Sequence, residues 1–281
     1  MVICRTSALC RLGGGTRTII TIEPPNGVDE HSCSATESKM DVPTIGQTRL
    51  VILGATGMVG GFALRYALDQ PTVGSVTAIS RRTLGLSHPK LHEILHQDFG
   101  DCSALASALS NQDAAIFCLG AYTGAVSDAQ LRAVTVGYVI EFARVLRASS
   151  PDAAFSFLSG NGADPTGQSR MAFARYKGEA ENVLEASGFP RLYILRPAYI
   201  YPVEPRKEPN LSYRVLRSIY PVFRALFPNQ VVRADDLAHV MVDLVVNRTG
   251  VAPNQIFENR DIRSMTHSLR RPQTEREKGR E

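Results

Sequence analysis

The fold is decided by the stretch Arg49-Leu50-Val51-Ile52-Leu53-Gly54-Ala55-Thr56-Gly57-Met58-Val59-Gly60-Gly61. Its four consecutive apolar residues, 50–53, predict a buried parallel strand. Three spaced glycines follow at once, and residues 62–68 have the pattern of an amphipathic helix. A strand, a glycine turn and a helix in this order predict a dinucleotide-binding turn rather than a merely structural one.

Each glycine of this turn has a physical task. Gly54 allows the tight turn, Gly57 lets the backbone approach a pyrophosphate, and Gly60 lets the helix pack close to the strand. The first helical turn then presents unpaired N–H groups and the positive end of the helix dipole to the phosphates. The predicted cofactor-binding residues of the turn are Gly54, Thr56, Gly57, Met58, Val59 and Gly60.

Composition narrows the class of protein. The chain has 281 residues, of which 44% are hydrophobic and 21% charged, as expected for one soluble domain with or without tails. No apolar run approaches the roughly 18 residues of a membrane span, so no integral membrane segment is expected. A net charge of +4 is too small to indicate a nucleic-acid partner. Five scattered cysteines and six histidines lack metal-ligand spacing, so no metal site is predicted.

The pattern divides the chain into three parts. We expect a disordered N-terminal extension over 1–46, a Rossmann-type domain over 47–263, and a disordered charged tail over 264–281. The unpatterned cysteines predict a cytoplasmic protein. The alternative is a mitochondrial location, because residues 1–21 contain arginines and no acid, as transit peptides do. A further alternative is that Met40 is the natural start.

Strands and helices alternate after residue 47. Strands are predicted over 76–80, 91–96, 114–120, 155–159, 193–196 and around Phe257, and helices over 104–109, 129–148, 171–186, 213–227 and 234–246. This alternation predicts an α/β fold, a doubly wound parallel sheet of Rossmann type with a small C-terminal substrate-side lobe. Ligands bind such sheets beyond the carboxyl ends of the strands, where Leu119, Gly120, Ser159 and Pro197 are expected.

The end of the second strand favours one cofactor. It reads Ser80-Arg81-Arg82, without the carboxylate that would bind a ribose 2′-hydroxyl. A guanidinium matches phosphate oxygens, so Arg81 and Arg82 favour NADP over NAD. The alternative is that they are two solvated surface arginines. Asp98, after the third strand, is predicted either to contact an adenine amino group or to form an ordinary turn.

By its motifs the chain resembles the short-chain dehydrogenase/reductase superfamily, in its extended or atypical form. The similarity is to the subgroup of HIV Tat-interacting oxidoreductase-like proteins, and it covers about residues 48–263. The residues that carry it lie in the stretches Gly54–Gly60, Ile79–Arg82, Phe117–Gly120, Leu158–Ser159 with Gly162–Asp164, Lys177–Glu181 and Leu195–Pro197.

The resemblance implies a catalytic serine at Ser159 and a lysine at Lys177 that binds the nicotinamide ribose. The acid/base tyrosine of the family, four residues before the lysine, is replaced by Phe173. Tyr176 cannot substitute for it, because neighbouring helical residues diverge by about 100°. Tyr199 and Tyr201, just after Pro197, are the candidates for a replacement hydroxyl, and Tyr199 is taken as the catalytic candidate.

Some of these residues have simpler interpretations. Ser159 is equally explained as the cap of the next turn, and Lys177 as a solvated helix lysine. Glu179 and Glu181 are expected to carry helix-surface or structural hydrogen bonds.

Three functions follow from these observations. The first is an NADP-dependent oxidoreductase that acts on a small carbonyl compound or alcohol, with Ser159, Lys177 and Tyr199 as catalytic candidates. The second is a catalytically silent NADP-binding protein that regulates a protein partner or senses redox state, as Phe173 suggests. A sugar-nucleotide epimerase or dehydratase ranks last, because the segment 198–263 is short for a nucleotide-sugar pocket.

Overall fold

A seven-stranded parallel sheet forms the centre of the fold. The computed structural model describes residues 47–121, 124, 126–204, 228–247 and 251–266. The strand order is β3-β2-β1-β4-β5-β6-β9, and each neighbouring pair is parallel. The bounds are β1 Thr48–Leu53, β2 Val73–Ser80, β3 Leu91–Leu95, β4 Ala114–Phe117, β5 Ala154–Leu158, β6 Arg191–Arg196 and β9 Gln255–Glu258. The predicted α/β fold class with a parallel sheet is therefore confirmed.

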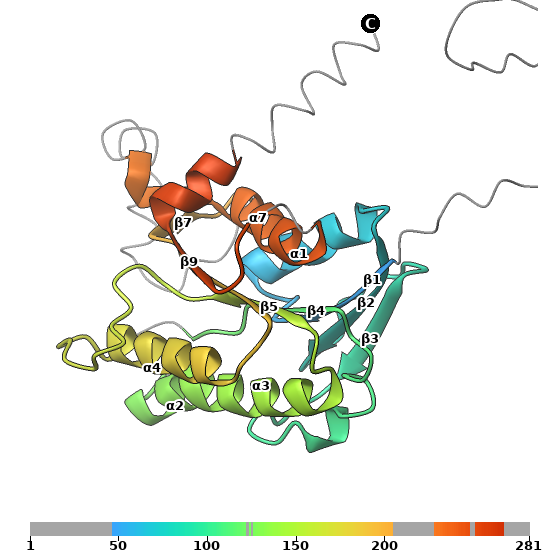
Figure 1. Cartoon of the computed structure of the whole chain (residues 1–281), viewed down its shortest axis with the longest axis horizontal. Coiled ribbons are helices and arrows are strands. Elements are labelled where there is room, and N and C mark those ends of the chain that lie inside the picture. Colours follow the sequence, from blue (N-terminus) through green and yellow to red (C-terminus); the bar gives the residue numbers. More distant parts are fainter. Residues whose placement is uncertain (1–46, 122–123, 125, 205–227, 248–250, 267–281) are drawn as a thin grey trace, which may run out of the picture. The chain divides into compact units, whose positions relative to one another are not determined.

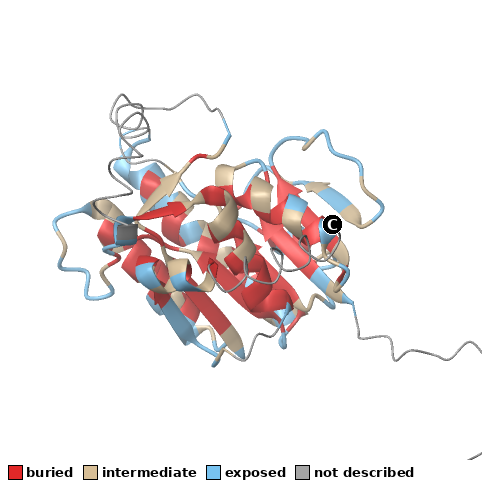
Figure 2. Cartoon of the chain, turned by 90° about the horizontal axis from the view of Figure 1, so that it is seen from above, coloured by how far each residue is buried: buried red, intermediate tan, exposed pale blue. Residues whose placement is uncertain are grey.

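Helices cover both faces of this sheet (Figure 1). Helices α1 (Met58–Asp69) and α7 (Ala234–Val246) lie on one face, and α3 (Tyr138–Ser149) and α4 (Ala172–Ala186) lie on the other. Successive strand side chains point to opposite faces, so Leu50 and Ile52 join the core under α1 and α7, while Val51 and Leu53 join the core under α3 and α4. Figure 2, which views the molecule from above, shows that the buried residues gather in its interior and the exposed ones along its outline.

The strand order reverses between β1 and β4. From β1 the chain builds outward through β2 and β3, and it then crosses back to β4 on the other side of β1. The two strands are joined at their ends, where the Cys118 N–H donates to the Leu53 carbonyl at 3.0 Å. Connections leave this point in opposite directions, which opens a crevice at the carboxyl ends of the strands.

Some predicted helices differ from the observed ones. The predicted helix 104–109 is only the 3₁₀ turn Ser103–Leu105 followed by turns, because a segment this short gains too few hydrogen bonds to offset nucleation. The predicted helix 129–148 is three pieces: α2 (Asp128–Arg132), a π-helical segment Ala133–Gly137, and α3. A capping box between Ser127 and Gln130 begins it one residue early.

The C-terminal part contains a small second sheet that the sequence did not predict. Strand β7 (Tyr199–Tyr201) pairs in parallel with β8 (Val231–Arg233), and residues 259–266 are helical after β9. The predicted helix 213–227 lies outside the described residues, as do residues 1–46 and 267–281.

Gly178 provides a test of how closely α4 packs. A Cβ at Gly178 would lie less than 3.0 Å from the backbone of Asp164 and Pro165, in the loop after β5. We expect Gly178→Ala to lower the free energy of unfolding by about 3 kcal/mol, because backbone has to move. Gly137→Ala is the matched control, since a Cβ at Gly137 meets no described atom within 4 Å. Denaturant unfolding measures both, and equal effects would contradict this packing.

Candidate functional site

A cavity of about 610 Å³ opens at the carboxyl ends of the central strands. This size is within the range of small-molecule and cofactor sites. Its walls come from the glycine turn, the ends of β4, β5 and β6, helix α4 and strand β7. The lining residues are Gly57, Met58, Val59, Cys118, Leu119, Gly120, Ala121, Thr135, Leu158, Ser159, Gly160, Asn161, Phe173, Lys177, Pro197, Ala198, Tyr199, Ile200 and Pro202.

The glycine turn has the geometry that the sequence predicted. Gly54 has a φ of +85°, and a Cβ there would lie 2.8 Å from the carbonyl carbon of Cys118. The Gly57 N–H closes the turn by donating to the Gly54 carbonyl at 2.8 Å. A Cβ at Gly60 would lie less than 3.0 Å from that same carbonyl. Gly54 and Gly60 therefore let α1 start directly beneath the turn, while Gly57 lies on the cavity wall.

The N-terminus of α1 fits an anionic ligand. Gly57 is its N-cap, no side chain caps the first turn, and this turn contains no acidic residue. Met58 and Val59 bring the first turn to the cavity wall. The unpaired N–H groups and the helix dipole together favour a phosphate at this position. The residues present thus fit the pyrophosphate of a dinucleotide.

Lys177 is a buried cavity residue rather than a solvated one. Its side chain extends from α4 toward β5, its residue is 5% exposed, and its ammonium donates to the Leu158 carbonyl at 2.7 Å. The ammonium also lies 4.7 Å from the centre of the Phe157 ring. Burial lowers the pKa of Lys177 to about 8, against the opposing effect of the Glu181 carboxylate. The remaining ammonium protons suit a ribose hydroxyl in the cavity.

Ser159 is tied to a buried ion pair behind the cavity. Its hydroxyl donates to the carboxylate of Glu181, which is almost fully buried. Arg196 clamps the same carboxylate, with its Nε donating to Oε1 at 3.0 Å and an Nη to Oε2. A carboxylate only accepts hydrogen bonds, so the Ser159 proton points away from the cavity. The structure confirms a structural role for Glu181, and Glu179 pairs with Arg132 at the surface.

Phe173 fills the space where a side chain at residue 160 would stand. A Cβ at Gly160 would lie 2.7 Å from Cζ of Phe173, and both residues line the cavity. The neighbouring Tyr176 faces away from the cavity, since its hydroxyl donates to the Asp128 carboxylate at 2.6 Å. The prediction that Tyr176 cannot replace the missing tyrosine is therefore confirmed.

Several cavity residues were not predicted from the sequence. Thr135 is buried and reaches the wall from the π-helical segment, which a regular helical pattern does not reveal. Cys118 also lines the cavity, and burial raises the pKa of its thiol to about 12. Asn161 and Ile200 follow Ser159 and Tyr199 closely, so proximity to the predicted residues was their only signal in the sequence.

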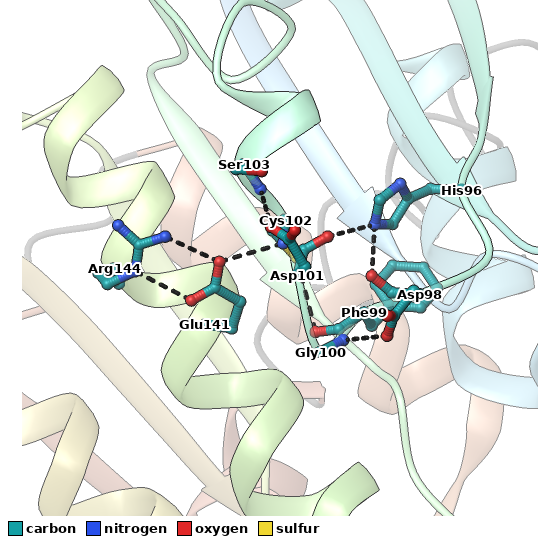
Figure 3. A network of polar contacts seen from close by, with 9 residues as sticks. All are labelled: His96, Asp98, Phe99, Gly100, Asp101, Cys102, Ser103, Glu141 and Arg144. Carbon is teal, nitrogen blue, oxygen red and sulfur yellow. Dashed lines mark hydrogen bonds and ion pairs between the residues drawn. The ribbon is translucent and has the colours of Figure 1, made fainter.

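Asp98 belongs to a tight turn after β3 (Figure 3). Its carboxylate accepts the Gly100 N–H at 2.9 Å, so the turn interpretation is confirmed. His96 Nε2 lies 2.7 Å from the Asp98 carbonyl and 3.0 Å from the Asp101 carbonyl. Because both partners are acceptors, this nitrogen carries the proton. The histidine therefore fastens both ends of the turn, and an adenine contact of Asp98 stays a prediction.

The same network connects the turn to α3. Glu141 accepts the Cys102 N–H at 3.1 Å and pairs with Arg144 on the next helical turn (Figure 3). Arg144 holds the pKa of Glu141 below its usual value. The carboxylate thus stays charged and anchors the loop that carries Asp98.

Arg81 and Arg82 are exposed beyond the end of β2. Their backbone is fixed, because the Ser80 hydroxyl donates to the Arg82 carbonyl at 2.6 Å and Gln97 donates to the Arg81 carbonyl at 2.7 Å. Within the described ranges neither guanidinium has an acidic partner. Arg81, Arg82, Asp98 and the exposed Thr56 all lie outside the lining of the cavity, whereas Pro197 and Tyr199 are part of it.

The described residues lack two further features. They contain no cluster of three or more His, Cys, Asp or Glu side chains that could hold a metal ion. In the same part of the chain, no helix has both the length and the apolar character to cross a membrane.

Comparisons with known proteins agree with this geometry. A family model described as NAD(P)H-binding matches residues 54–248. The chain is 35% identical over 158 residues to the protein fmp52, mitochondrial, of Aspergillus clavatus, covering 54% of this chain and 66% of that one. It is 27% identical over 237 residues to the corresponding Saccharomyces cerevisiae protein, covering 78% and 96%. It is 30% identical over 151 residues to rat HTATIP2, covering 53% and 61%.

Solved structures share the fold. The Bordetella bronchiseptica enzyme WbmG in complex with NAD superposes with a TM-score of 0.57 at 16% identity, covering 80% of this chain and 78% of that one. Uronate dehydrogenase from Agrobacterium tumefaciens superposes with a TM-score of 0.56 at 17% identity, covering 75% and 76%.

The buried lysine gives stability a specific pH dependence. The pKa of Lys177 is about 8 in the folded chain and near 10.5 when unfolded, so the unfolded state binds more protons between these values. The charged lysine costs stability below pH 8, and this cost fades as the pH rises toward 10.5. We expect Lys177→Met to stabilise the chain at pH 7 by on the order of 3 kcal/mol, since one pKa unit corresponds to about 1.4 kcal/mol.

Denaturant unfolding of both proteins at pH 7 and pH 10.5 measures this difference. The stabilisation should shrink at the higher pH, and a difference that does not change with pH would contradict the burial of the charge.

Proposed function

This chain belongs to the NAD(P)H-binding family of short-chain dehydrogenase/reductase-like proteins, and on that premise we propose that it binds NADP(H) and transfers hydride to or from a small carbonyl compound or alcohol. The observation that carries the proposal is the shared cavity of the uncapped α1 N-terminus and the buried Lys177 ammonium. One site thus holds donors for both a pyrophosphate and a ribose, which are the invariant parts of a dinucleotide.

The chain's own residues divide the work of binding. Met58 and Val59 would hold the phosphates with backbone N–H groups beside Gly57, and Lys177 would hold the ribose of the nicotinamide half. Leu119, Gly120 and Pro197, at the ends of β4 and β6, would border the nicotinamide. The reduced nicotinamide supplies the hydride when it is bound.

A small substrate would share this cavity with the nicotinamide. Phe173, Tyr199, Ile200, Pro202 and Ser159 are among the lining residues that it would contact. Tyr199 is the phenol in this part of the wall and remains the candidate for a proton donor. The Ser159 hydroxyl, committed to Glu181, offers its lone pairs rather than its proton to a ligand.

A second candidate function is an NADP-binding protein without catalysis that senses redox state through a protein partner. The contact between Phe173 and Gly160 favours it, because it removes both a phenolic hydroxyl and a neighbouring side chain from the wall. Tight NADPH binding, with no acceptor raising the rate of NADPH oxidation, would support this candidate over the first.

The preference for NADP is tested on the two arginines after β2. In the double variant Arg81→Ala/Arg82→Ala, we expect NADPH affinity to fall about 10- to 100-fold, because hydrogen bonds between charged groups contribute about 1.5–3 kcal/mol. NADH affinity should stay unchanged. Nucleotide fluorescence titration measures both, and Arg260→Ala, in the exposed helix after β9, is the matched control. A double variant that keeps its preference for NADPH would contradict the assignment.

A mitochondrial location is part of the proposal. Two relatives in fungi carry that location in their names, and residues 1–21 contain Arg5, Arg11 and Arg17 without an acid. We expect residues 1–46 fused to a fluorescent protein to enter mitochondria, and the fusion with all three arginines changed to alanine to stay outside. Microscopy and fractionation distinguish the two, and a cytosolic native fusion would favour Met40 as the start.

A further inference from the structure

We propose that the substrate is a quinone: a planar, conjugated carbonyl compound that can be reduced without a proton from the protein. This inference deepens the proposed function and rests on it, since NADPH is the hydride donor. It follows from the proton donors that the cavity wall lacks and from the apolar surface that it presents.

At position 173 the wall lacks the usual proton donor, and at position 160 it lacks the room for a side chain. Phe173 ends in a C–H where a tyrosine would carry its hydroxyl, and its ring lies where a residue 160 side chain would begin. Gly160 therefore accommodates the phenyl ring, and the two positions act as one unit. Together they form an apolar surface on the substrate side of the cavity.

The polar groups next to this surface hold their protons elsewhere. The Ser159 hydroxyl donates to Glu181, whose carboxylate is fixed by Arg196. One proton of the Lys177 ammonium goes to the Leu158 carbonyl, and the others are those that would bind the nicotinamide ribose. The Cys118 thiol is partly buried and donates to the sulfur of Met241 at 3.9 Å. Tyr199 is then the phenol that a test has to examine.

A cavity without a proton donor favours hydride acceptors whose reduced anions are weak bases. Hydride addition to an aliphatic ketone creates an alkoxide about as basic as hydroxide, the conjugate base of water with a pKa of about 15.7, so the step needs an acid. Hydride transfer to a quinone creates a hydroquinone monoanion, a phenolate with a pKa of about 10. NADPH is oxidised to NADP⁺, the quinone gains two electrons and one proton as hydride, and water supplies the second proton afterwards.

The shape and polarity of the wall fit the same class. Phe173 presents an aromatic ring, and Leu158, Pro197, Ile200 and Pro202 continue the apolar lining around it. A flat aromatic ligand packs against such a surface, whereas a polyhydroxylated sugar would leave its hydroxyls without partners there.

The experiment compares two ligands of the same bicyclic size, 1,4-naphthoquinone and 1-tetralone. With NADPH and full-length protein, and after subtraction of the rate without protein, we expect kcat/KM for the quinone to exceed that for the ketone at least 100-fold. At saturating NADPH, kcat for the quinone should be independent of pH from 6 to 9. Saturation-transfer NMR on the protein loaded with NADP⁺, which cannot react, should show both ligands bound and Phe173→Ala weakening both.

A variant that restores the acid provides the complementary test. Phe173→Tyr places a phenol four residues before Lys177, and general acids contribute typically 10²- to 10⁴-fold. We expect it to raise the ratio of ketone to quinone reduction at least 10-fold. Tyr176→Phe is the matched control on the same helix, since its hydroxyl is bound to Asp128 outside the cavity, and it should leave the ratio unchanged.

Other outcomes separate the two proposals. Ketone reduction by the wild type at a rate comparable to the quinone, lost at high pH and in Tyr199→Phe, would reveal a protein acid and overturn the quinone assignment. NADPH binding without reduction of either ligand would overturn it too, while the nucleotide site stands. A chain that binds no NADPH would overturn the proposed function itself.

Discussion

Helix α1 lies so close to the turn that precedes it that residue 60 has to be a glycine. The Gly54 carbonyl lies against the Cα of Gly60, where a side chain has no room. This contact sets where α1 begins, and hence that its first turn faces the cavity. It also sets the depth at which α1 lies beside α7, with Tyr66 stacked on His239 at 3.9 Å between ring centres. The sheet, the helix layer and the anion site depend on this one steric constraint.

The polar interior of the site is organised by a second constraint, the burial of charge. Glu181 and Arg196 lie beneath the cavity floor, and a buried carboxylate is tolerated only with partners. Ser159 is one of those partners, so a residue at the active-site edge is used to satisfy the core. Lys177, in contrast, has no such ion pair at its ammonium among the described residues, and burial disfavours its charged form and lowers its pKa to about 8. The site therefore offers more groups that can bind a ligand than groups that can donate a proton to it.

The sequence predicted those features that local patterns encode. Residues 49–61 predicted a strand, a turn and a helix, because the backbone of this turn requires glycine at its spaced positions. The alternation of strands and helices predicted a parallel sheet. The π-helical segment that delivers Thr135 and the pairing of β7 with β8 depend on tertiary contacts, which no periodicity records. The departure at Phe173 was visible, but its contact with Gly160 joins two segments separated in the sequence, and only the folded chain brings them together.

In helix α4, the residues that hold the helix in the fold are different from the residues that face the cavity. Gly178 packs against a loop, Glu179 pairs with an exposed arginine, and Glu181 pairs with a partly buried one. Phe173 and Lys177, in contrast, face the cavity. Successive residues point in different directions, so each is subject to a separate selective pressure. A lineage can exchange the cavity-facing position 173 while the residues that hold the helix in place stay fixed. Such a scaffold can drift between reactions, or between enzyme and sensor, without passing through an unfolded ancestor.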